Sequence, residues 1–279
     1  MTDPRAAPRA ALTAIGQLAD SEIDVGNAAL QLARVEAPDA DWQLAARHLS
    51  HLAHAAVKRA AAMDKEDLPA RATALAEMLA GEFGYAGDLE TYDDLANANL
   101  IRVTERRRGL PVALGVIWLH TARAAGWGSH GVDFPAHFLV ALEGHKTQVV
   151  LDVFNGGQLM SARELRALLK RVEGEKAELR PGLLQPMSTR RVLLRLQNNI
   201  VTRRLDVGDL RGGLRCTEDM LLIAPDQAEL WRQAGVMNQK LDQVAAARNC
   251  YQRFLDLVPE GSVANGVRAQ LDILKSMLN

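Results

Sequence analysis

The chain is predicted to adopt an α+β fold with a helical N-terminal part, a small antiparallel sheet and helical repeats towards its C-terminal end. Two strand-like runs, residues 131–142 and 147–154, lie among stretches whose apolar residues follow helical spacing. Two prolines in the last third of the chain stand one helical-repeat period apart. Because 279 residues suffice for one large or two modest domains, we expect a core domain over residues 1–180 and repeats over residues 187–279.

The first hundred residues are rich in alanine and are predicted to be helical. One helix is indicated by Pro38 and by the possible N-caps Asp39 and Asp41, which precede apolar residues at helical spacing. Pro111 suits the first position of a later helix, because the N–H that proline lacks would have no partner there. Helices are expected over residues 69–79, 91–107, 111–125 and 161–171.

The two strand-like runs are predicted to form a hairpin. The residues between them, Glu143-Gly144-His145-Lys146, suit a two-residue turn with Gly144 at its first central position. In that register His137 and Asp152 oppose each other on one side of the sheet, close enough to touch. An aspartate that orients a histidine is shared by Ser/His/Asp and Cys/His/Asp sites, so both are candidate catalytic residues.

A nucleophile for this pair is missing from the sequence. Papain-like sites place it at the N-terminus of a helix, where the helix dipole stabilises a thiolate. Residues 109–115 contain no Cys, Ser or Thr, and both cysteines, Cys216 and Cys250, fall in the repeat region as packing residues. The pair therefore has four possible roles: a structural contact between strands, a vestige of a site, part of a ligand pocket, or a general base acting on water.

The last hundred residues contain a helical repeat. Pro225 and Pro259 are 34 residues apart, which is the period of tetratricopeptide repeats. The repeat pattern is matched at five positions, with Asn238 where an aromatic is usual: Trp231, Ala234, Gly235, Ala247 and Tyr251. The small Gly235 and Ala247 are expected to let the two helices of one hairpin approach closely. Residues 263–278 are expected to cap the stack. Such repeats present a concave surface, so a protein or peptide partner is expected here.

Composition excludes several classes of function. Lys and Arg number 33 against 34 Asp and Glu, which argues against a general nucleic-acid binder. The longest apolar run, residues 110–119, is shorter than the ~18 residues that cross a bilayer, and residues 1–24 resemble no signal peptide. We expect a cytoplasmic protein that binds neither membrane nor nucleic acid.

Three histidines at steps of three might suggest a metal site. His48, His51 and His54 lie on one predicted helix, but each step turns the next side chain by about 60°, so the outer two diverge. We therefore expect no metal site, and nothing in the sequence indicates a cofactor.

Five blocks of sequence resemble the bacterial SirB-type proteins, which join a transglutaminase-like (papain-like) core to C-terminal tetratricopeptide repeats. The blocks are Phe83-Gly-Tyr-Ala-Gly-Asp88, Asn97-Ala-Asn-Leu100, Glu105-Arg-Arg-Arg-Gly-Leu-Pro111, Gly131-Val-Asp-Phe-Pro-Ala-His-Phe-Leu139 and Asp152-Val-Phe-Asn-Gly-Gly157. The resemblance extends over roughly residues 10 to 265 and implies the same domain order in this chain.

The resemblance also assigns residues. It implies that His137 and Asp152 match the histidine and aspartate of the transglutaminase-like core. Counting back about fifteen residues from Gly126, which ends Arg123-Ala-Ala-Gly126, places the expected cysteine at Pro111. Similar proteins often have Ser at the positions of Ala113 and Gly115, and Gly at that of Ala136.

We therefore predict a non-catalytic, transglutaminase-like pseudoenzyme that acts through protein–protein contacts, with regulation as one such role. The alternative is an amide or ester hydrolase in which His137 and Asp152 form a dyad with water or an unidentified nucleophile. Exposure of His137 in an open cleft would favour the hydrolase.

Overall fold

The computed structural model describes residues 3–64 and 67–276, which form two compact units. We call residues 19–196 the core unit, and residues 3–18 with 197–276 the repeat unit. The division falls inside the helix α8 (Thr189–Asp206). It differs from the predicted division, which set the boundary at residues 180–187 and placed the first helix with the core. Leu278, within the predicted capping segment, lies outside the described residues.

The core unit is built around a five-stranded antiparallel sheet. Its strand order is β6-β5-β4-β3-β7. The strands are β3 (Ser129–Phe134), β4 (His137–Glu143), β5 (Gln148–Asp152), β6 (Gln158–Leu159) and β7 (Pro186–Met187). A separate parallel pair joins β1 (Ala86–Gly87) to β2 (Arg108–Gly109).

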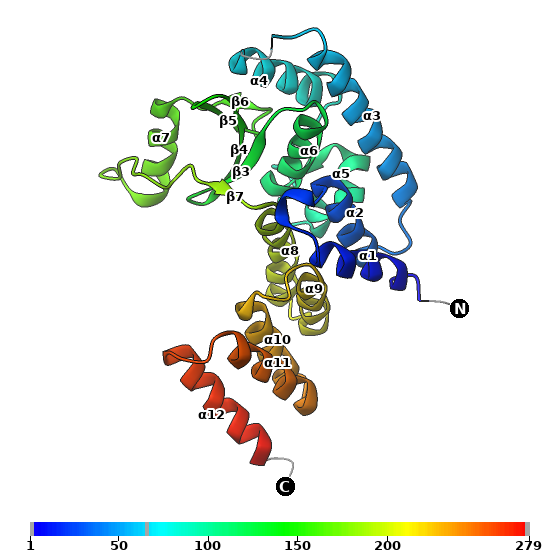
Figure 1. Ribbon diagram of the computed structural model, residues 1–279, viewed down its shortest axis with the longest axis vertical. Coiled ribbons are helices and arrows are strands. Elements are labelled where there is room, and N and C mark those ends of the chain that lie inside the picture. The colour runs from blue at the N-terminus through cyan, green and yellow to red at the C-terminus, as the bar shows by residue number, and fades with distance from the viewer. Residues whose placement is uncertain (1–2, 65–66, 277–279) are drawn as a thin grey trace. The chain divides into compact units, whose positions relative to one another are not determined.

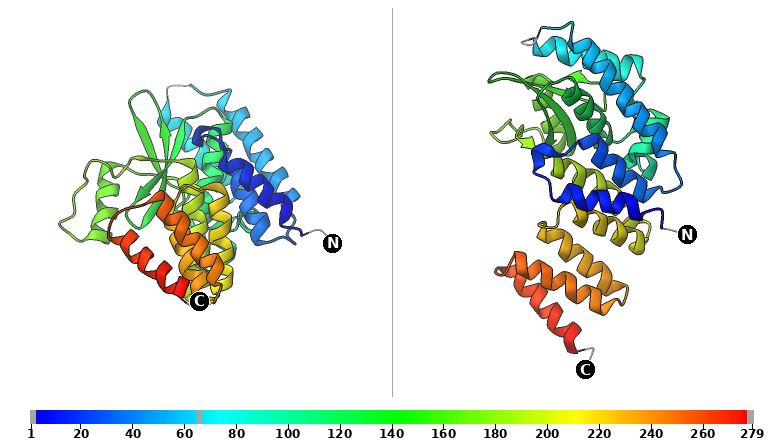
Figure 2. Two further views of the ribbon diagram at one scale, coloured as in Figure 1. Left: turned by 60° about the horizontal axis from the view of Figure 1, so that its bottom comes forward. Right: turned by 45° about the vertical axis from the view of Figure 1, so that its right-hand side comes forward.

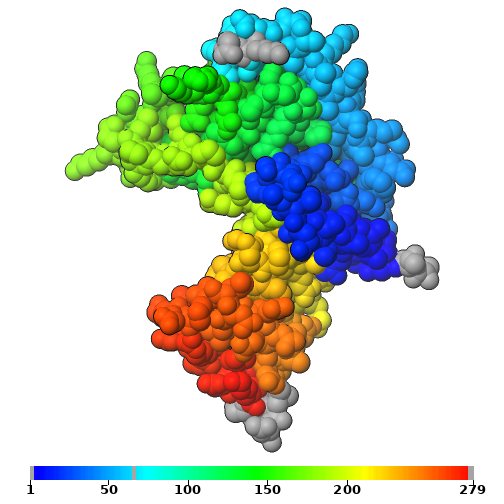
Figure 3. Space-filling view, in the orientation of Figure 1, coloured from blue at the N-terminus to red at the C-terminus, as the bar shows by residue number. Residues whose placement is uncertain are grey.

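Helices cover both faces of the sheet (Figure 1). One face packs on α6 (Pro111–Ala124), and the other on α7 (Ala162–Glu173) through an apolar cluster that includes Val132, Leu139 and Leu168. The segment that follows α7 lies at the surface beside the strands (Figure 3). The remaining helices of the core unit are η1 (Asp20–Glu22), α2 (Val25–Glu36), α3 (Trp42–Ala60), α4 (Leu68–Ala76), the π-helical η2 (Glu77–Glu82), η3 (Leu95–Ala98) and α5 (Leu100–Arg106).

Helix α6 is the central helix of the core unit. All of residues 112–119 are buried, as expected for a helix that is apolar on every side. It contacts α2, α3 and α5 as well as β3 and β4. Pro111 occupies its first position, as predicted. Gly115 is required by close packing, because a Cβ there would stand 2.1 Å from Cε1 of Phe138.

The hairpin of β4 and β5 has a register two residues away from the predicted one. Val140 pairs with Leu151, whereas the predicted turn pairs it with Val149. The loop contains four residues, 144–147, and the Gly144 N–H donates to the Thr147 carbonyl at 2.9 Å. The predicted two-residue turn is therefore wrong, and with it the opposition of His137 and Asp152.

Most of the other predicted helices are found, and one is wrong in its first half. The side chain of Asp41 caps α3, and that of Ser161 caps α7. Residues 91–94 form a loop where a helix was predicted, and α5 begins only at Leu100. Asn99 stops the helix from extending backwards, because its side chain accepts the N–H of Ile101 at 3.1 Å as an N-cap.

The repeat unit consists of helices packed in succession, which Figure 2 shows from yellow to red. They are α9 (Leu210–Ile223), α10 (Ala228–Lys240), α11 (Val244–Leu257) and α12 (Ser262–Ser276). A Cβ on Gly235 would stand 2.5 Å from the ring of Tyr251, so the predicted close approach of α10 and α11 is confirmed. The N-terminal helix α1 (Ala6–Gly16) packs on α9, where Arg9 pairs with Asp219 at 2.7 Å. No helix in the described ranges is long and apolar enough to cross a membrane.

Replacing Gly115 by Ala should lower the free energy of unfolding of the core unit by about 1–3 kcal/mol, because the added methyl overlaps Phe138 in a packed core. Urea denaturation followed by circular dichroism measures the change. The control is Gly81→Ala, at a position with nothing within 4 Å of the added atom. An equal effect of both substitutions would contradict the packing argument.

Candidate functional site

The N-terminus of α6 carries no nucleophile. Pro111 stands first in the helix, preceded by Leu110, whose N–H donates to the Asn97 carbonyl at 2.9 Å. The next side chains are buried and apolar. Both thiols lie in the repeat unit, where Cys216 is buried and donates to the side chain of Gln197, and burial raises the pKa of Cys250. The helix start therefore offers no thiolate or hydroxyl for acyl transfer.

His137 is the first residue of β4 and is half-buried. Its Nδ1 lies 3.0 Å from the carbonyl oxygen of Pro135. A carbonyl only accepts, so Nδ1 carries a proton and donates it to this oxygen. Ala136, just before it, has a φ of 56°, a left-handed conformation that glycine adopts more readily.

Asp152 ends β5 and is 6% exposed. Its Oδ1 accepts the N–H groups of Phe154 at 3.1 Å and Asn155 at 3.3 Å, and its Oδ2 accepts from Nδ2 of Asn155 at 2.7 Å. The carboxylate thus holds the loop that turns from β5 to β6. His137 and Asp152, both within the described residues, form no hydrogen bond or ion pair with each other.

The pair also lies on the side of the sheet away from α6. Successive strand residues face opposite sides, and Phe138 meets Gly115 of α6. Leu139 instead belongs to the cluster against α7, and His137, two residues earlier, shares its side. Asp152 lines a pocket of about 520 Å³ with Glu164 and Arg171 of α7. The sheet therefore stands between the helix start and the two residues that a triad would need beside it.

An ion pair between the buried Asp88 and the exposed Arg106, which sequence reasoning missed, orders the loop before α6. The Asp88 carboxylate accepts from the N–H and hydroxyl of Thr91, each at 2.8 Å, and from Nη2 of Arg106 at 2.7 Å. The two hydrogen bonds from Thr91 above all, followed by those from Asn97 and Glu90, lower the pKa of Asp88 to about 2. Both residues lie in blocks shared with SirB-type proteins, and that was the only signal available.

A second network joins α3 to the start of the loop. Tyr85 is buried, and its hydroxyl accepts from Nη1 of Arg107 at 2.8 Å and lies 3.0 Å from Nε2 of His48. Nη2 of Arg107 lies 3.3 Å from Nδ1 of His48. Burial, followed by the charge of Arg107, lowers the pKa of His48 to about 4. A neutral imidazole that donates from Nε2 to the Tyr85 oxygen and accepts from Arg107 at Nδ1 fits both of its contacts.

The histidine series of α3 does not converge on one point. His48 belongs to the Tyr85 network, while His51 and His54 line a pocket of about 640 Å³ with Lys58 and Glu82. The described part of the chain has no group of three or more His, Cys, Asp or Glu side chains placed to hold a metal ion.

Comparison with known proteins agrees with this architecture. The model of the transglutaminase-like superfamily matches residues 43–198, and a tetratricopeptide repeat model matches residues 203–272. A UPF0162 protein of Xylella fastidiosa is 32% identical over 257 residues, which cover 90% of each chain. The chain belongs to the UPF0162 family, within the transglutaminase-like superfamily.

Further relatives extend this UPF0162 assignment. A UPF0162 protein of Vibrio cholerae is 30% identical over 215 residues, covering 77% of this chain and 79% of the relative. Protein SirB1 of Salmonella typhimurium is 23% identical over 195 residues, covering 70% and 72%. The predicted SirB-type resemblance and the α+β fold with a transglutaminase-like core are thus confirmed. No solved structure is significantly similar to the chain.

A double-mutant cycle tests the separation of His137 and Asp152. His137→Ala should cost less than about 1 kcal/mol of unfolding free energy, since one partly exposed hydrogen bond is lost. Asp152→Ala should cost about 1–3 kcal/mol, because three donors lose a buried acceptor. The double variant should equal the sum within about 0.5 kcal/mol. A coupling energy above about 1 kcal/mol, by urea denaturation, would show that the two side chains interact.

The Asp88 network predicts a stability change in acid. Because folding lowers the pKa of Asp88 from 3.8 to about 2, its contribution is complete above about pH 4 and is lost as the pH falls towards 2. Asp88→Asn should be less stable at neutral pH and should lose less stability than wild type between pH 4 and pH 2. Denaturation curves across this range measure both effects, with the exposed Glu90→Gln as control. Parallel curves for wild type and Asp88→Asn would contradict the assignment.

Proposed function

We propose that this UPF0162 chain is a non-catalytic transglutaminase-like protein that acts by binding a protein partner through its repeat unit, in a regulatory or assembly role. The observation that supports a non-catalytic core is the arrangement of the residues expected to form its site. Pro111 stands at the helix start, and His137 and Asp152, both among the described residues, share no hydrogen bond or ion pair. A core that keeps the fold without a working site is free to serve as a scaffold for the repeats.

The hydrolase alternative draws less support from the geometry. A histidine base needs an orienting partner and a nearby group that stabilises the oxyanion. The Asp152 carboxylate is engaged by its own loop, and the carbonyl of Pro135 is the group that fixes His137. The proposal therefore gives the pair a structural role, Asp152 in the β5–β6 loop and His137 at the β3–β4 turn.

The binding surface proposed for the partner is a groove between α8 and α10. Its α10 wall carries Arg232, Val236 and Lys240, spaced four residues apart on one helix face, with Met237 behind them. Leu205 of α8 faces them and is 41% exposed. We call this set the repeat groove.

The chemistry of the repeat groove indicates one kind of partner. Its volume of about 180 Å³ lies below the roughly 300–1,000 Å³ of small-molecule sites, so it suits one apolar anchor side chain of a peptide. Arg232 is paired with Glu229 at 2.6 Å, while the exposed Lys240 adds a positive charge at the end of the groove. We therefore propose an amphipathic segment with an apolar anchor followed by an acidic residue.

The experiment compares partner capture by groove variants of the full-length protein. Val236→Glu and Lys240→Glu should each weaken the partner about tenfold or more, because one buries a charge and the other reverses the charge attraction. Val263→Glu, which makes the same substitution at an exposed valine of α12 outside the groove, should leave binding unchanged. Circular dichroism shows whether each variant retains its helices.

Capture alone does not show which segment of the partner binds the repeat groove, so the affinity of the partner's segments is then measured directly. Synthetic peptides that cover its acidic segments are titrated against each variant by fluorescence anisotropy. Loss of binding in both groove variants and its retention in Val263→Glu support the proposal. Equal binding by all variants would contradict the proposal that the partner binds in the repeat groove.

A further inference from the structure

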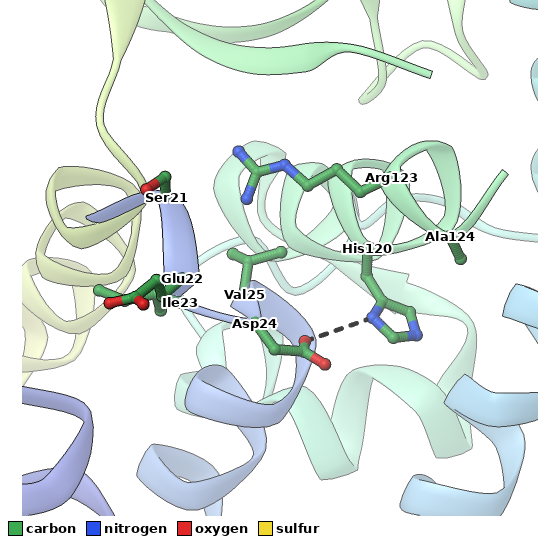
Figure 4. A pocket seen from close by; sticks show the side chains of 8 residues that line it. All are labelled: Ser21, Glu22, Ile23, Asp24, Val25, His120, Arg123 and Ala124. Carbon is green, nitrogen blue, oxygen red and sulfur yellow. Dashed lines mark ion pairs between the residues drawn. The ribbon is translucent and has the colours of Figure 1, made fainter. Parts of the chain in front are cut away.

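Two adjoining pockets lie at the end of α6 away from Pro111, around Arg123. The larger has a volume of about 790 Å³ and the smaller about 290 Å³, and Ser21, Ile23 and Arg123 line both. Figure 4 shows the smaller pocket, where the Arg123 guanidinium extends towards Ser21 and lies apart from the Asp24–His120 ion pair. All of these residues belong to the core unit.

Arg123 is a half-buried guanidinium without a counterion. Its Nη1 donates to Oγ1 of Thr189 at 3.0 Å and its Nη2 to the Ser129 carbonyl at 3.3 Å, which uses two of its five N–H groups. No carboxylate among the described residues lies within ion-pair distance of it. Burial lowers the pKa of Arg123, and Asp20, Asp24 and Glu143 only partly offset this. Its charge is therefore incompletely compensated.

The neighbouring acids already have partners of their own. Asp20 accepts the N–H groups of Thr189 and Arg190, each at 2.8 Å, which caps α8. Asp24 caps α2 through Asn27. In Glu143, Oε1 meets Nδ1 of His130 at 2.5 Å. Arg123 thus remains the one lining cation of the larger pocket, while the acids around both pockets make a second negative charge on a ligand unfavourable.

Ser129 and Glu143, which also line the larger pocket, contribute two more polar groups. Ser129 is 8% exposed and its hydroxyl has no hydrogen bond, which is rare for a buried polar group. Oε2 of Glu143 lies beside Gly128, where a Cβ would stand only 2.9 Å from it, so the glycine keeps that approach clear. An unpaired cation and an exposed carboxylate therefore line one cavity, with an unpartnered hydroxyl buried in its wall.

We propose that this cavity, which we call the Arg123 pocket, binds a small zwitterion of the amino-acid class. The ligand carboxylate lies against the unused N–H groups of Arg123 and accepts from the Ser129 hydroxyl. Its ammonium group lies against Oε2 of Glu143. The volume is within the range of small-molecule sites, and Ile23 and Met187 provide apolar walls for a side chain. The site is independent of the proposed protein partner and of the repeat groove.

Binding is tested on the full-length protein with the twenty free L-amino acids, each by ligand-observed NMR, followed by calorimetry for those that bind. The best ligand is then compared with its N-acetyl derivative, its carboxamide and inorganic phosphate. Each derivative lacks one charge and should bind about tenfold more weakly, the loss of one charge-assisted hydrogen-bonding group. Phosphate that binds more tightly than every amino acid, or derivatives that bind as well as the parent, would overturn the proposal, as would no binding at all.

Variants of the pocket test which residues bind the amino acid. Ser129→Ala removes a hydroxyl that has no partner in the free protein, so the fold should be unaffected and the amino acid should bind about three- to tenfold more weakly. Glu143→Gln should weaken the amino acid and leave its N-acetyl derivative unchanged. Arg123→Gln should abolish binding of both. The control Ser50→Ala, on the exposed face of α3, should bind as wild type does.

If Arg123→Gln fails to fold, Ser129→Ala and Glu143→Gln still decide the outcome. Unchanged affinity in both of these folded variants would show that the amino acid binds elsewhere and would overturn the assignment.

Discussion

The core unit depends on the complete burial of α6 between the sheet and the N-terminal helices. Every residue from 112 to 119 is buried, so the helix gains its stability from packing and tolerates little change. Close contact with the sheet is possible because Gly115 leaves room for Phe138. This contact also fixes which residues of β4 face the helix. Since side chains alternate along a strand, placing Phe138 against α6 directs His137 to the other side.

The same constraint determines how the start of α6, His137 and Asp152 are placed within the transglutaminase-like fold. Acyl transfer requires a nucleophile, a histidine and an orienting carboxylate within hydrogen-bonding reach of one another. Here α6 begins with Pro111, which has no nucleophilic side chain, and the carboxylate of Asp152 stabilises its own loop. The ordered networks of this unit lie elsewhere, with Asp88 and Arg106 before α6 and Arg123 at its far end. They mark the parts of the core that a ligand or partner would find preorganised.

The sequence predicts those parts of the structure that depend on local signals. Pro111 at a helix start, the cap Asp41, and the glycine that lets α10 approach α11 each act within a few residues or one repeat. The hairpin register was wrong because it depends on one loop of four residues, and a shift of two changes every partner. The predicted contact between His137 and Asp152 rested on that register and was wrong with it. Pairs such as Asp88 with Arg106, 18 residues apart, depend on tertiary packing and carry no periodic signal.

The central claim is that the start of α6 and His137 no longer form one site, and a thiol introduced at the helix start tests it most directly. In Pro111→Cys, at a partly exposed position, the pH dependence of alkylation by iodoacetamide gives the pKa of the new thiol. Wild-type protein supplies the background from Cys216 and Cys250. The account predicts the same midpoint with and without His137→Ala. A midpoint that rises by about one unit or more when His137 is removed would show that the histidine still stabilises a thiolate there, and would contradict the account.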